Sequence, residues 1–265
     1  MGRHDMRALA RIAAIGGACA ALAAPAADRA DAEPGFSVKL GYDRSVGKYD
    51  QPADTVVSTS SVTATYDIGD YSFDVVLPYL QEKGPGRLIT VGGRRPIVVA
   101  GPDRKASGRG DVTVGMTRFL LNEDQHAVDL DLGAIYKFGT ASVDKGLGTG
   151  KDDVSIQAAL GRSLGDFNAT LSAGYVFVGK PADQSLRDAA YGSFDLSYRL
   201  NEAVSAGFTY SAGAAVVKGI SGGRDGTAYV NFKPTKNFRV EVYYLKGWGS
   251  QSPDRGGGLT LACDI

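Results

Sequence analysis

Charged side chains at every second position of apolar segments are the residues of this chain best suited to act on a solute. Within residues 128–138, Asp129 and Asp131 alternate with Leu130 and Leu132. Because successive side chains of a strand point to opposite faces, both carboxylates must share one face and both leucines the other. Water hydrates carboxylates, whereas their burial in lipid is unfavourable. We therefore expect a hydrated interior lined by Asp74, Asp129, Asp131, Lys137, Asp195, Arg239 and Glu241, in phase with Lys39, Asp43 and Lys233.

Lining charges of both signs allow two outcomes. They can create a field across a pore that selects solutes, since pore selectivity depends on lining charge and width. They can equally pair with one another and fill a narrow barrel. A barrel of about twelve strands lies between packed eight-stranded barrels and open sixteen-stranded porins, so both outcomes stay open.

A second concentration of charge lies within residues 81–110. Seven cations stand there against two anions, Glu82 and Asp103, which leaves a local charge of +5 in a neutral chain. Such a segment can attract anionic solutes or the phosphates of outer-leaflet lipid. It can also be a solvated outer loop without a site. The cations are Lys83, Arg87, Arg94, Arg95, Arg104, Lys105 and Arg109.

Residues typical of catalysis or metal binding are sparse. His4 lies in the N-terminal segment, and His126 lies beside a predicted short turn, away from any outer-leaflet or external substrate. A general base must reach its nucleophile or water, and no His/Cys set has metal-ligand spacing. The glycine-rich segment 146–151 lacks the Walker spacing and precedes a strand rather than a helix. We expect no enzymatic activity, no metal and no cofactor.

The elements that position these residues are about twelve strands. Each alternates apolar and polar residues over roughly ten positions, the length that a tilted membrane-spanning strand needs. Aromatic residues stand at both ends of the apolar stripes, as in the girdles at the two bilayer interfaces. The predicted strands are roughly 35–43, 55–68, 71–80, 111–121, 127–138, 153–164, 167–178, 191–200, 203–212, 226–233, 238–248 and 257–265.

Short and long connections alternate along the chain. The connections 69–70, 122–125, 165–166, 201–202 and 234–237 carry Gly, Asp, Asn and Pro, which suit tight hairpins. Short periplasmic turns and long outer loops are typical of outer-membrane barrels. Within the longest connection, residues 88–91 and 97–100 predict an additional hairpin whose arms are too short to span. It either stands above the rim or folds into the mouth.

The N-terminus resembles a cleavable export signal. A basic segment, residues 1–7, precedes the apolar residues 12–24, and small-x-small sites follow at 24–26 and 30–32. We expect a signal peptide over 1–32, cleaved between 26 and 32, and one barrel over 33–265. Cys19 raises a lipoprotein alternative, against which Gly16 argues because a Leu is usual there. Loss of Cys19 leaves Cys263 without an intrachain disulfide partner.

The predicted fold is all-β, a single antiparallel up-and-down transmembrane barrel. After residue 32, no stretch approaches the ~20 apolar residues of a spanning helix, and only a helix or a closed barrel satisfies its backbone in lipid. A soluble barrel or sandwich with its apolar face inward is the alternative. Long strands, aromatic strand ends and many small residues on the polar face favour the membrane barrel.

Three short segments carry a resemblance to a known family. They are Phe73-Asp74-Val75-Val76-Leu77-Pro78-Tyr79, Gly110-Asp111-Val112-Thr113-Val114-Gly115, and Lys137-Phe138-Gly139-Thr140 followed by Gly148-Thr149-Gly150-Lys151-Asp152-Asp153-Val154. On these residues, the chain from about residue 36 resembles the outer-membrane barrels named for the MetA pathway of phenol degradation, within the wider group of fatty-acid and aromatic-hydrocarbon transporters. The resemblance implies passive passage of small molecules, apolar or aromatic ones among them, and it supplies no site residue. The chain departs from the family at Phe138-Gly139-Thr140, where the family has Pro-Thr-Gly, and at Ile265, where such barrels usually end in an aromatic residue.

Together these observations predict a porin-like channel or passive transporter in the outer membrane of a Gram-negative envelope. The alternatives are a non-conducting structural or adhesion barrel and an enzyme that modifies outer-membrane lipid. Expected partners are outer-membrane lipid and lipopolysaccharide, the barrel-assembly machinery and a small solute. Equal numbers of cations and anions, 29 of each, argue against a nucleic-acid partner.

Overall fold

The computed structural model describes residues 34–265, so the predicted signal peptide and its cleavage site lie outside the described residues. The described chain folds into thirteen strands that form one antiparallel sheet. No helix within residues 34–265 is long and apolar enough to cross a membrane. The strands are β1 (Gly35–Gly47), β2 (Thr55–Ile68), β3 (Tyr71–Ile89), β4 (Ile97–Arg109), β5 (Thr113–Leu121), β6 (Asp129–Lys137), β7 (Asp153–Leu164), β8 (Phe167–Phe177), β9 (Ala189–Arg199), β10 (Val204–Gly213), β11 (Gly223–Thr235), β12 (Phe238–Trp248) and β13 (Arg255–Asp264).

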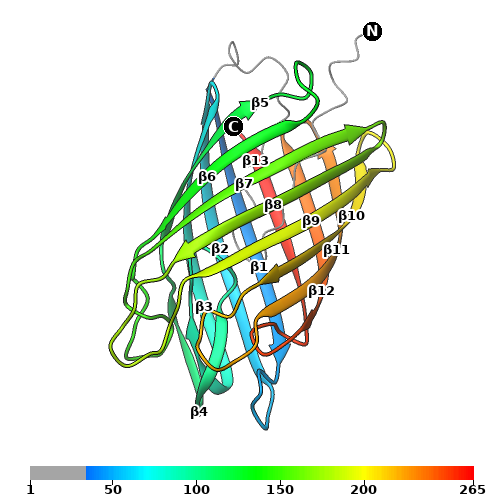
Figure 1. Ribbon diagram of the computed structural model, residues 1–265. Coiled ribbons are helices and arrows are strands. Elements are labelled where there is room, and N and C mark those ends of the chain that lie inside the picture. Colours follow the sequence, from blue (N-terminus) through cyan, green and yellow to red (C-terminus); the bar gives the residue numbers. More distant parts are fainter. Residues whose placement is uncertain (1–33) are drawn as a thin grey trace.

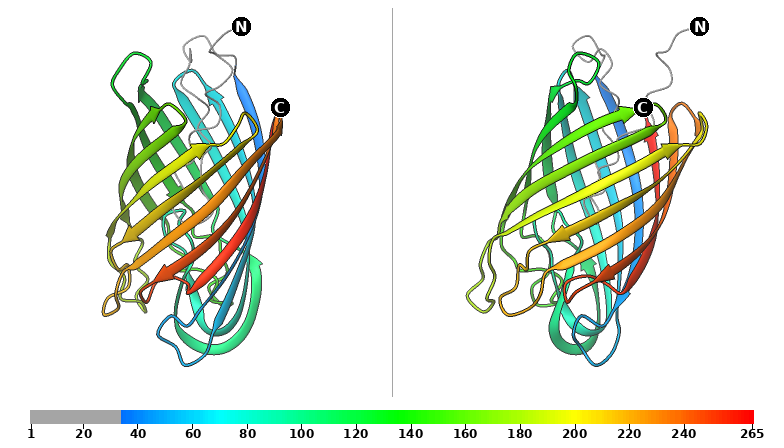
Figure 2. Two further views of the ribbon diagram at one scale, coloured as in Figure 1. Left: turned by 90° about the vertical axis from the view of Figure 1, so that its right-hand side faces the viewer. Right: turned by 45° about the vertical axis from the view of Figure 1, so that its right-hand side comes forward.

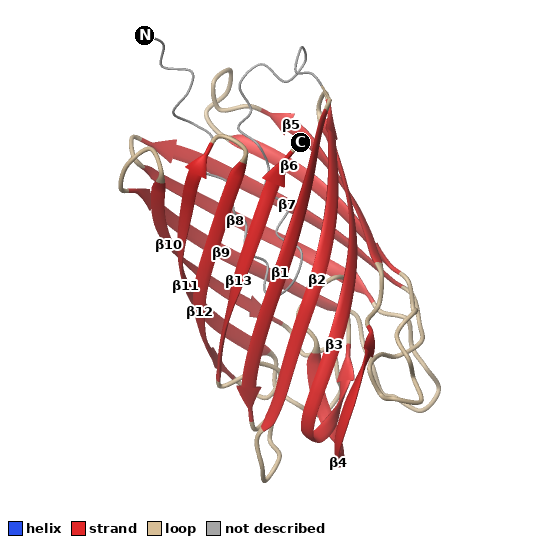
Figure 3. Ribbon diagram, turned by 180° about the vertical axis from the view of Figure 1, so that it is seen from behind, coloured by secondary structure: helices blue, strands red, loops and turns tan. Residues whose placement is uncertain are grey.

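The first and last strands close the sheet into a barrel. β1 pairs with β13 from Ser37 opposite Asp264 to Val46 opposite Arg255, and the N–H of Ile265 donates to the carbonyl of Phe36 at 2.8 Å. β13, β1 and β2 lie side by side along the wall (Figure 3). Of the thirteen strands, β4 pairs only with β3 and stands outside the ring, which leaves a closed barrel of twelve. The predicted fold class and strand number are confirmed.

All predicted short turns lie at the end of the barrel where β1 begins and β13 ends (Figure 1). Gly69 and Gly165 occupy the tight turns with φ of 52° and 65°, a conformation that glycine adopts without steric cost. The long connections gather at the opposite end. The predicted alternation of turn lengths is present, and the chain ends on the side of the barrel where it begins.

The outward face of the wall is an apolar belt. On β8, Leu171 is 58 % exposed, whereas its neighbour Ser172 is buried inside and shares a hydrogen bond with Ser193. Most aromatic residues of this face form one group near the short turns and another near the long loops, and Phe194 and Phe208 lie between the two groups. The first group comprises Phe36, Tyr66, Tyr71, Phe73, Phe167, Tyr198 and Phe232, and the second Tyr42, Tyr79, Tyr136, Phe138, Tyr175, Phe177, Tyr210, Tyr244 and Trp248.

A long hairpin interrupts the regular wall. The first part of β3 pairs with β5 and its second part with β4, so β4 and β5 follow one another along the same edge of β3. Between them, the N–H of Gly110 donates to the carbonyl of Pro78 at 2.8 Å. The hairpin predicted at 88–91 and 97–100 exists, but its arms are longer than expected, because β3 alone has 19 residues.

The same hairpin turns back on itself beyond the rim. Gly84 and Gly86 have φ of 131° and 146°, and the β3–β4 register shifts between Pro85 and Arg87. Residues with a Cβ atom rarely adopt such φ values, so the bend requires glycine at these positions. The hairpin curves under the end of the barrel in both views of Figure 2. Its tip contacts strands from two sides of the wall. Of the two alternatives, the hairpin therefore folds into the mouth and does not stand above the rim.

We expect Leu171→Arg to weaken the barrel, because it places a cation near the centre of a lipid-facing strand. The expected loss in free energy of unfolding is about 2–4 kcal/mol if the site lies at the bilayer midplane. Urea unfolding of protein refolded into vesicles, followed by heat-modifiable gel mobility, measures it. The matched control, Leu171→Phe, should retain stability. An arginine variant as stable as the wild type would contradict the lipid-facing assignment.

Candidate functional site

The tip of the β3–β4 hairpin, residues 87–99, crosses the mouth of the barrel; we call it the inserted tip. On one side, Leu88 and Val98 pack in a buried cluster with Val57 and Leu80. Tyr49 and Leu147, from two of the long loops, complete that cluster. Apolar burial on this side fastens the tip to the β2–β3 part of the wall.

A second buried cluster holds the other side of the inserted tip. It contains Ile89, Val91 and Ile97 from the tip, with Val176 and Tyr191 from β8 and β9. Leu186 and Val216 enter it from the loops 178–188 and 214–222. The tip thus bridges distant parts of the wall, and the long loops pack onto it instead of extending into solvent.

A buried lysine fixes the inserted tip to the wall between β6 and β7. The Nζ atom of Lys137 lies 3.1 Å from Asp111 Oδ2, 3.1 Å from Asp153 Oδ2 and 3.1 Å from the carbonyl oxygen of Thr90 in the tip. The side chains of Lys137, Asp111 and Asp153 are each at most 1 % exposed. Charges buried this deeply are tolerated only when they are paired and hydrogen-bonded.

Both carboxylates of this lysine network accept further hydrogen bonds. Asp153 accepts the N–H of Gly92 at 3.0 Å and the N–H of Gly179 at 2.8 Å. Asp111 accepts the hydroxyl of Thr90 and, at 2.7 Å, the N–H of Ala141. The network therefore joins the inserted tip to four separate segments of the chain, those of Asp111, Lys137–Ala141, Asp153 and Gly179.

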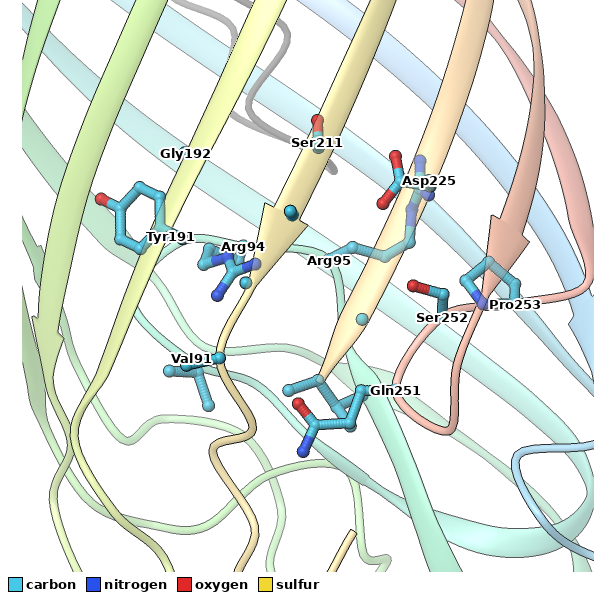
Figure 4. A pocket seen from close by; sticks show the side chains of 15 residues that line it. Val91, Arg94, Arg95, Tyr191, Gly192, Ser211, Asp225, Gln251, Ser252 and Pro253 are labelled. Atoms are coloured by element: carbon cyan, nitrogen blue, oxygen red, sulfur yellow. The ribbon is translucent and has the colours of Figure 1, made fainter. Parts of the chain in front are cut away.

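The arginine pair Arg94 and Arg95 occupies the end of the inserted tip and faces a recess in the barrel interior (Figure 4). Side chains of the tip, of β9–β11 and of residues 251–253 line the recess. Its far wall comes from β9, β10 and β11 and is built of small residues, among them Gly192, Gly213 and Gly223. A Cβ atom on Gly213 would come within 2.6 Å of the Arg94 guanidinium, so the small wall is what leaves room beside the tip.

The two arginines have different surroundings. The Arg94 guanidinium lies over the ring of Tyr191, 4.8 Å from its centroid, in a cation–π arrangement. Burial lowers the pKa of Arg94, and the nearby Tyr191 and Asp225 oppose that shift. Arg95 lies 3.7 Å from Asp43 Oδ2, and Asp43 also accepts the hydroxyl of Tyr243.

The structure places the seven residues expected to line the interior on the inward phase of their strands, but it separates them into groups. Asp74 and Glu241 both face the charge of Lys39, and Asp195 is close enough to influence Glu241. Asp195 is itself buried and accepts hydrogen bonds from Thr209 at 2.6 Å and Tyr229 at 3.0 Å.

The other four expected residues lie away from this group of charges. Asp129 is buried and accepts the N–H of Glu123 at 3.0 Å, near a short turn. Asp131 is half-buried and sits opposite Ala159 of β7. Arg239 pairs with Asp264 at 2.6 Å near the last residue, and Lys137 belongs to the lysine network. Their part in solute passage stays a prediction.

The basic segment is not a single exposed loop. Arg94 and Arg95 face inward, whereas Arg104 pairs with Glu82 at 2.6 Å and donates to the carbonyl of Gly146 at 2.9 Å. Arg87 lies 3.6 Å from Asp183. Lys105 and Arg109 are exposed on the outward face of β4, where their partners across the pair are Lys83 and Tyr79.

Sequence reasoning missed the lysine network, although its members were visible in the sequence. Asp111, Lys137 and Asp153 lie in the segments that carry the family resemblance, and the resemblance supplied no site residue. The glycine-rich segment 146–151 has a structural role: the carbonyl of Gly146 accepts the N–H of Leu88 at 2.8 Å. His126 is exposed at a short turn, and no group of possible metal ligands occurs within residues 34–265.

We expect Lys137→Met to destabilise the protein, because it leaves two buried carboxylates facing each other without a cation. Breaking a buried ion pair in this way costs about 3–5 kcal/mol of unfolding free energy. Urea unfolding measures the loss, and limited trypsin digestion after Arg94 or Arg95 reports release of the tip.

The matched control for the lysine variant combines it with Asp111→Asn and Asp153→Asn. This triple variant removes the uncompensated charges and should recover part of the lost stability. Wild-type stability and protease resistance in Lys137→Met alone would show that the network does not hold the tip.

Comparison with known proteins agrees with this geometry. The model of the family described as putative MetA-pathway of phenol degradation matches residues 27–265. The match spans most of the chain, so the chain belongs to this family. None of the curated proteins matches the chain.

Solved structures share the fold. An outer membrane channel from Pseudomonas putida F1 matches with a TM-score of 0.71 and 12 % identity, over 92 % of this chain and 100 % of that one. The translocator domain of the autotransporter NalP from Neisseria meningitidis matches with a TM-score of 0.54 and 11 % identity, over 88 % and 89 %. The closed barrel and the apolar belt between two aromatic groups place the protein in the outer membrane.

Proposed function

We propose that this member of the MetA-pathway phenol-degradation family is a passive outer-membrane channel for small molecules, with its narrowest part beside the inserted tip. The observation that carries the proposal is the recess between the arginine pair and the glycine-rich wall of β9–β11. Inward polar and charged residues continue from that recess along the barrel, so a solute would meet hydrated walls. The similar structure from Pseudomonas putida F1 is described as an outer membrane channel, which supports the proposal.

Small aromatic compounds are the solutes we propose, because the family is described by a pathway of phenol degradation. Tyr191, Val91 and Ile97 give the recess apolar surface next to its charged groups. A site with both kinds of surface suits a molecule with an apolar ring and a polar substituent.

A lipid-modifying enzyme is the weaker alternative. An enzyme of that kind needs a nucleophile or a base near the lipid, and His126 lies exposed at a short turn, at the end opposite the long loops. A non-conducting barrel is the stronger rival, because the inserted tip fills part of the mouth. Conductance separates that rival from a channel.

We expect the purified protein to form pores in planar bilayers, and a variant with a shortened tip to form wider ones. Replacing residues 90–96 by a short Gly-Ser linker removes the side chains that face the recess. Single-channel conductance should rise, since the constriction is lost. A control shortening of the short turn at 122–128 should leave conductance unchanged. Absence of current from the wild type, with or without current from the shortened variant, would favour the non-conducting barrel.

We further propose that the outward face of β3 and β4 binds phosphates of outer-leaflet lipopolysaccharide. Lys83 lies directly opposite Lys105 in the hairpin, and both side chains are exposed. Like charges in directly opposed positions destabilise a sheet, and an anion between them removes the repulsion. Phosphate is the anion that an outer leaflet offers at this height above the apolar belt.

The double variant Lys83→Gln, Lys105→Gln tests this surface. Wild-type protein should unfold at a higher temperature in vesicles with lipopolysaccharide than in vesicles of zwitterionic phospholipid, and the double variant should lose that difference. Lys236→Gln, at a short turn on the opposite end, is the matched control. Equal lipopolysaccharide stabilisation of wild type and double variant would assign the lipid contact elsewhere.

A further inference from the structure

We propose that the arginine pair of the inserted tip is a binding step for small monocarboxylates with an apolar or aromatic body. The inference rests on the proposed channel function and names the solute class that the channel selects. It comes from four features of the recess: a guanidinium held on an aromatic ring, buried donors without acceptors, a counter-charge that limits binding strength, and an apolar wall.

Arg94 supplies the first donor. Its guanidinium lies 4.8 Å from the centroid of Tyr191, and none of the ion pairs formed within residues 34–265 involves it. A guanidinium stacked on a ring is restrained in position while its N–H groups remain available. Its planar fork of donors matches the two oxygens of a carboxylate.

Arg95 supplies buried donors beside it. Its side chain is 13 % exposed, and its Nε and Nη1 atoms have no hydrogen-bond partner. The ion pair with Asp43 is loose, at 3.7 Å, and the Asp43 carboxylate also accepts the hydroxyl of Tyr243. Buried donors without acceptors are unfavourable, and a carboxylate that enters the recess relieves this cost.

Asp225 limits how tightly an anion binds. It lines the same recess, and its Oδ1 atom is buried without a partner (Figure 4). Together with Asp43, it balances the two arginine charges, so the recess as a whole is neutral. A permeant solute must bind well enough to enter and weakly enough to leave. A second carboxylate on the solute would meet Asp225, and this repulsion favours monocarboxylates over dicarboxylates.

The apolar part of the recess selects the body of the solute. Val91 and Ile97 of the tip and the ring of Tyr191 from β9 give the recess its apolar surface. Glycine and alanine residues at positions 192 and 212–214 leave space on the opposite side. A flat or branched hydrocarbon group fits between these surfaces while its carboxylate meets the arginines.

Uptake into liposomes that contain the full mature protein tests the inference, with benzoate and its neutral analogue benzamide as probes. In the wild type, benzoate should enter about tenfold faster than benzamide, as expected for one charge-assisted hydrogen-bonding step. Arg94→Gln and Arg95→Gln should bring the ratio close to one. Arg94→Lys keeps the charge but loses the planar fork, so its ratio should fall between these values.

Arg109→Gln, on the outward face of β4, is the matched control and should keep the wild-type ratio. Potassium chloride conductance and heat-modifiable mobility show that each variant is folded and open. A wild-type ratio near one in a conducting protein would overturn the carboxylate assignment and leave the channel intact. No conductance and no uptake of either probe would overturn the channel function, and the assignment with it.

Discussion

The ion pairs of Lys137 with Asp111 and Asp153 are the interaction on which the mouth of this barrel depends. They place one ammonium and two carboxylates in a region that excludes water, where each charge is stable only through the others. Through the carbonyl of Thr90 and the N–H of Gly92, the same network holds the inserted tip. The recess exists because the tip is held there instead of extending beyond the rim.

The membrane imposes the second constraint. A strand in lipid must satisfy every backbone group within the sheet, and closure of β1 on β13 removes the last free edge of the ring. β4 is the exception, because only β3 pairs with it. It extends above the apolar belt, where water and headgroups can satisfy its open edge. The interruption at residues 110–112 separates the β5 segment that belongs to the ring from the β4 segment that stands above it.

Charge is distributed unevenly between the faces and ends of the barrel. The inward phase carries paired groups, such as Asp195 with Tyr229 and Thr209, that rigidify the interior wall. The outward phase carries cations near the ends of the strands, for example Lys83 and Lys105 in the hairpin and Arg118 over the ring of Tyr71 near the short turns. The arginine pair differs from both sets of charges, because it belongs to a connecting segment but is held inside the barrel. A mobile loop with the same charge would attract anions without orienting them.

The sequence by itself determined the barrel. Period-two alternation, two aromatic groups and alternating turn lengths are local properties, because each strand presents its two faces regardless of its neighbours. The inward phase of Asp74 and Asp195 could be read in the same way. The lysine network could not be predicted, since its members at positions 90, 111, 137 and 153 are far apart along the chain. Only barrel closure and the bend at Gly84 and Gly86 bring them together, and the tertiary structure alone therefore decided that the basic segment enters the mouth. The physical reason is that alternation encodes which face a residue occupies, whereas a site depends on which residues meet across the interior.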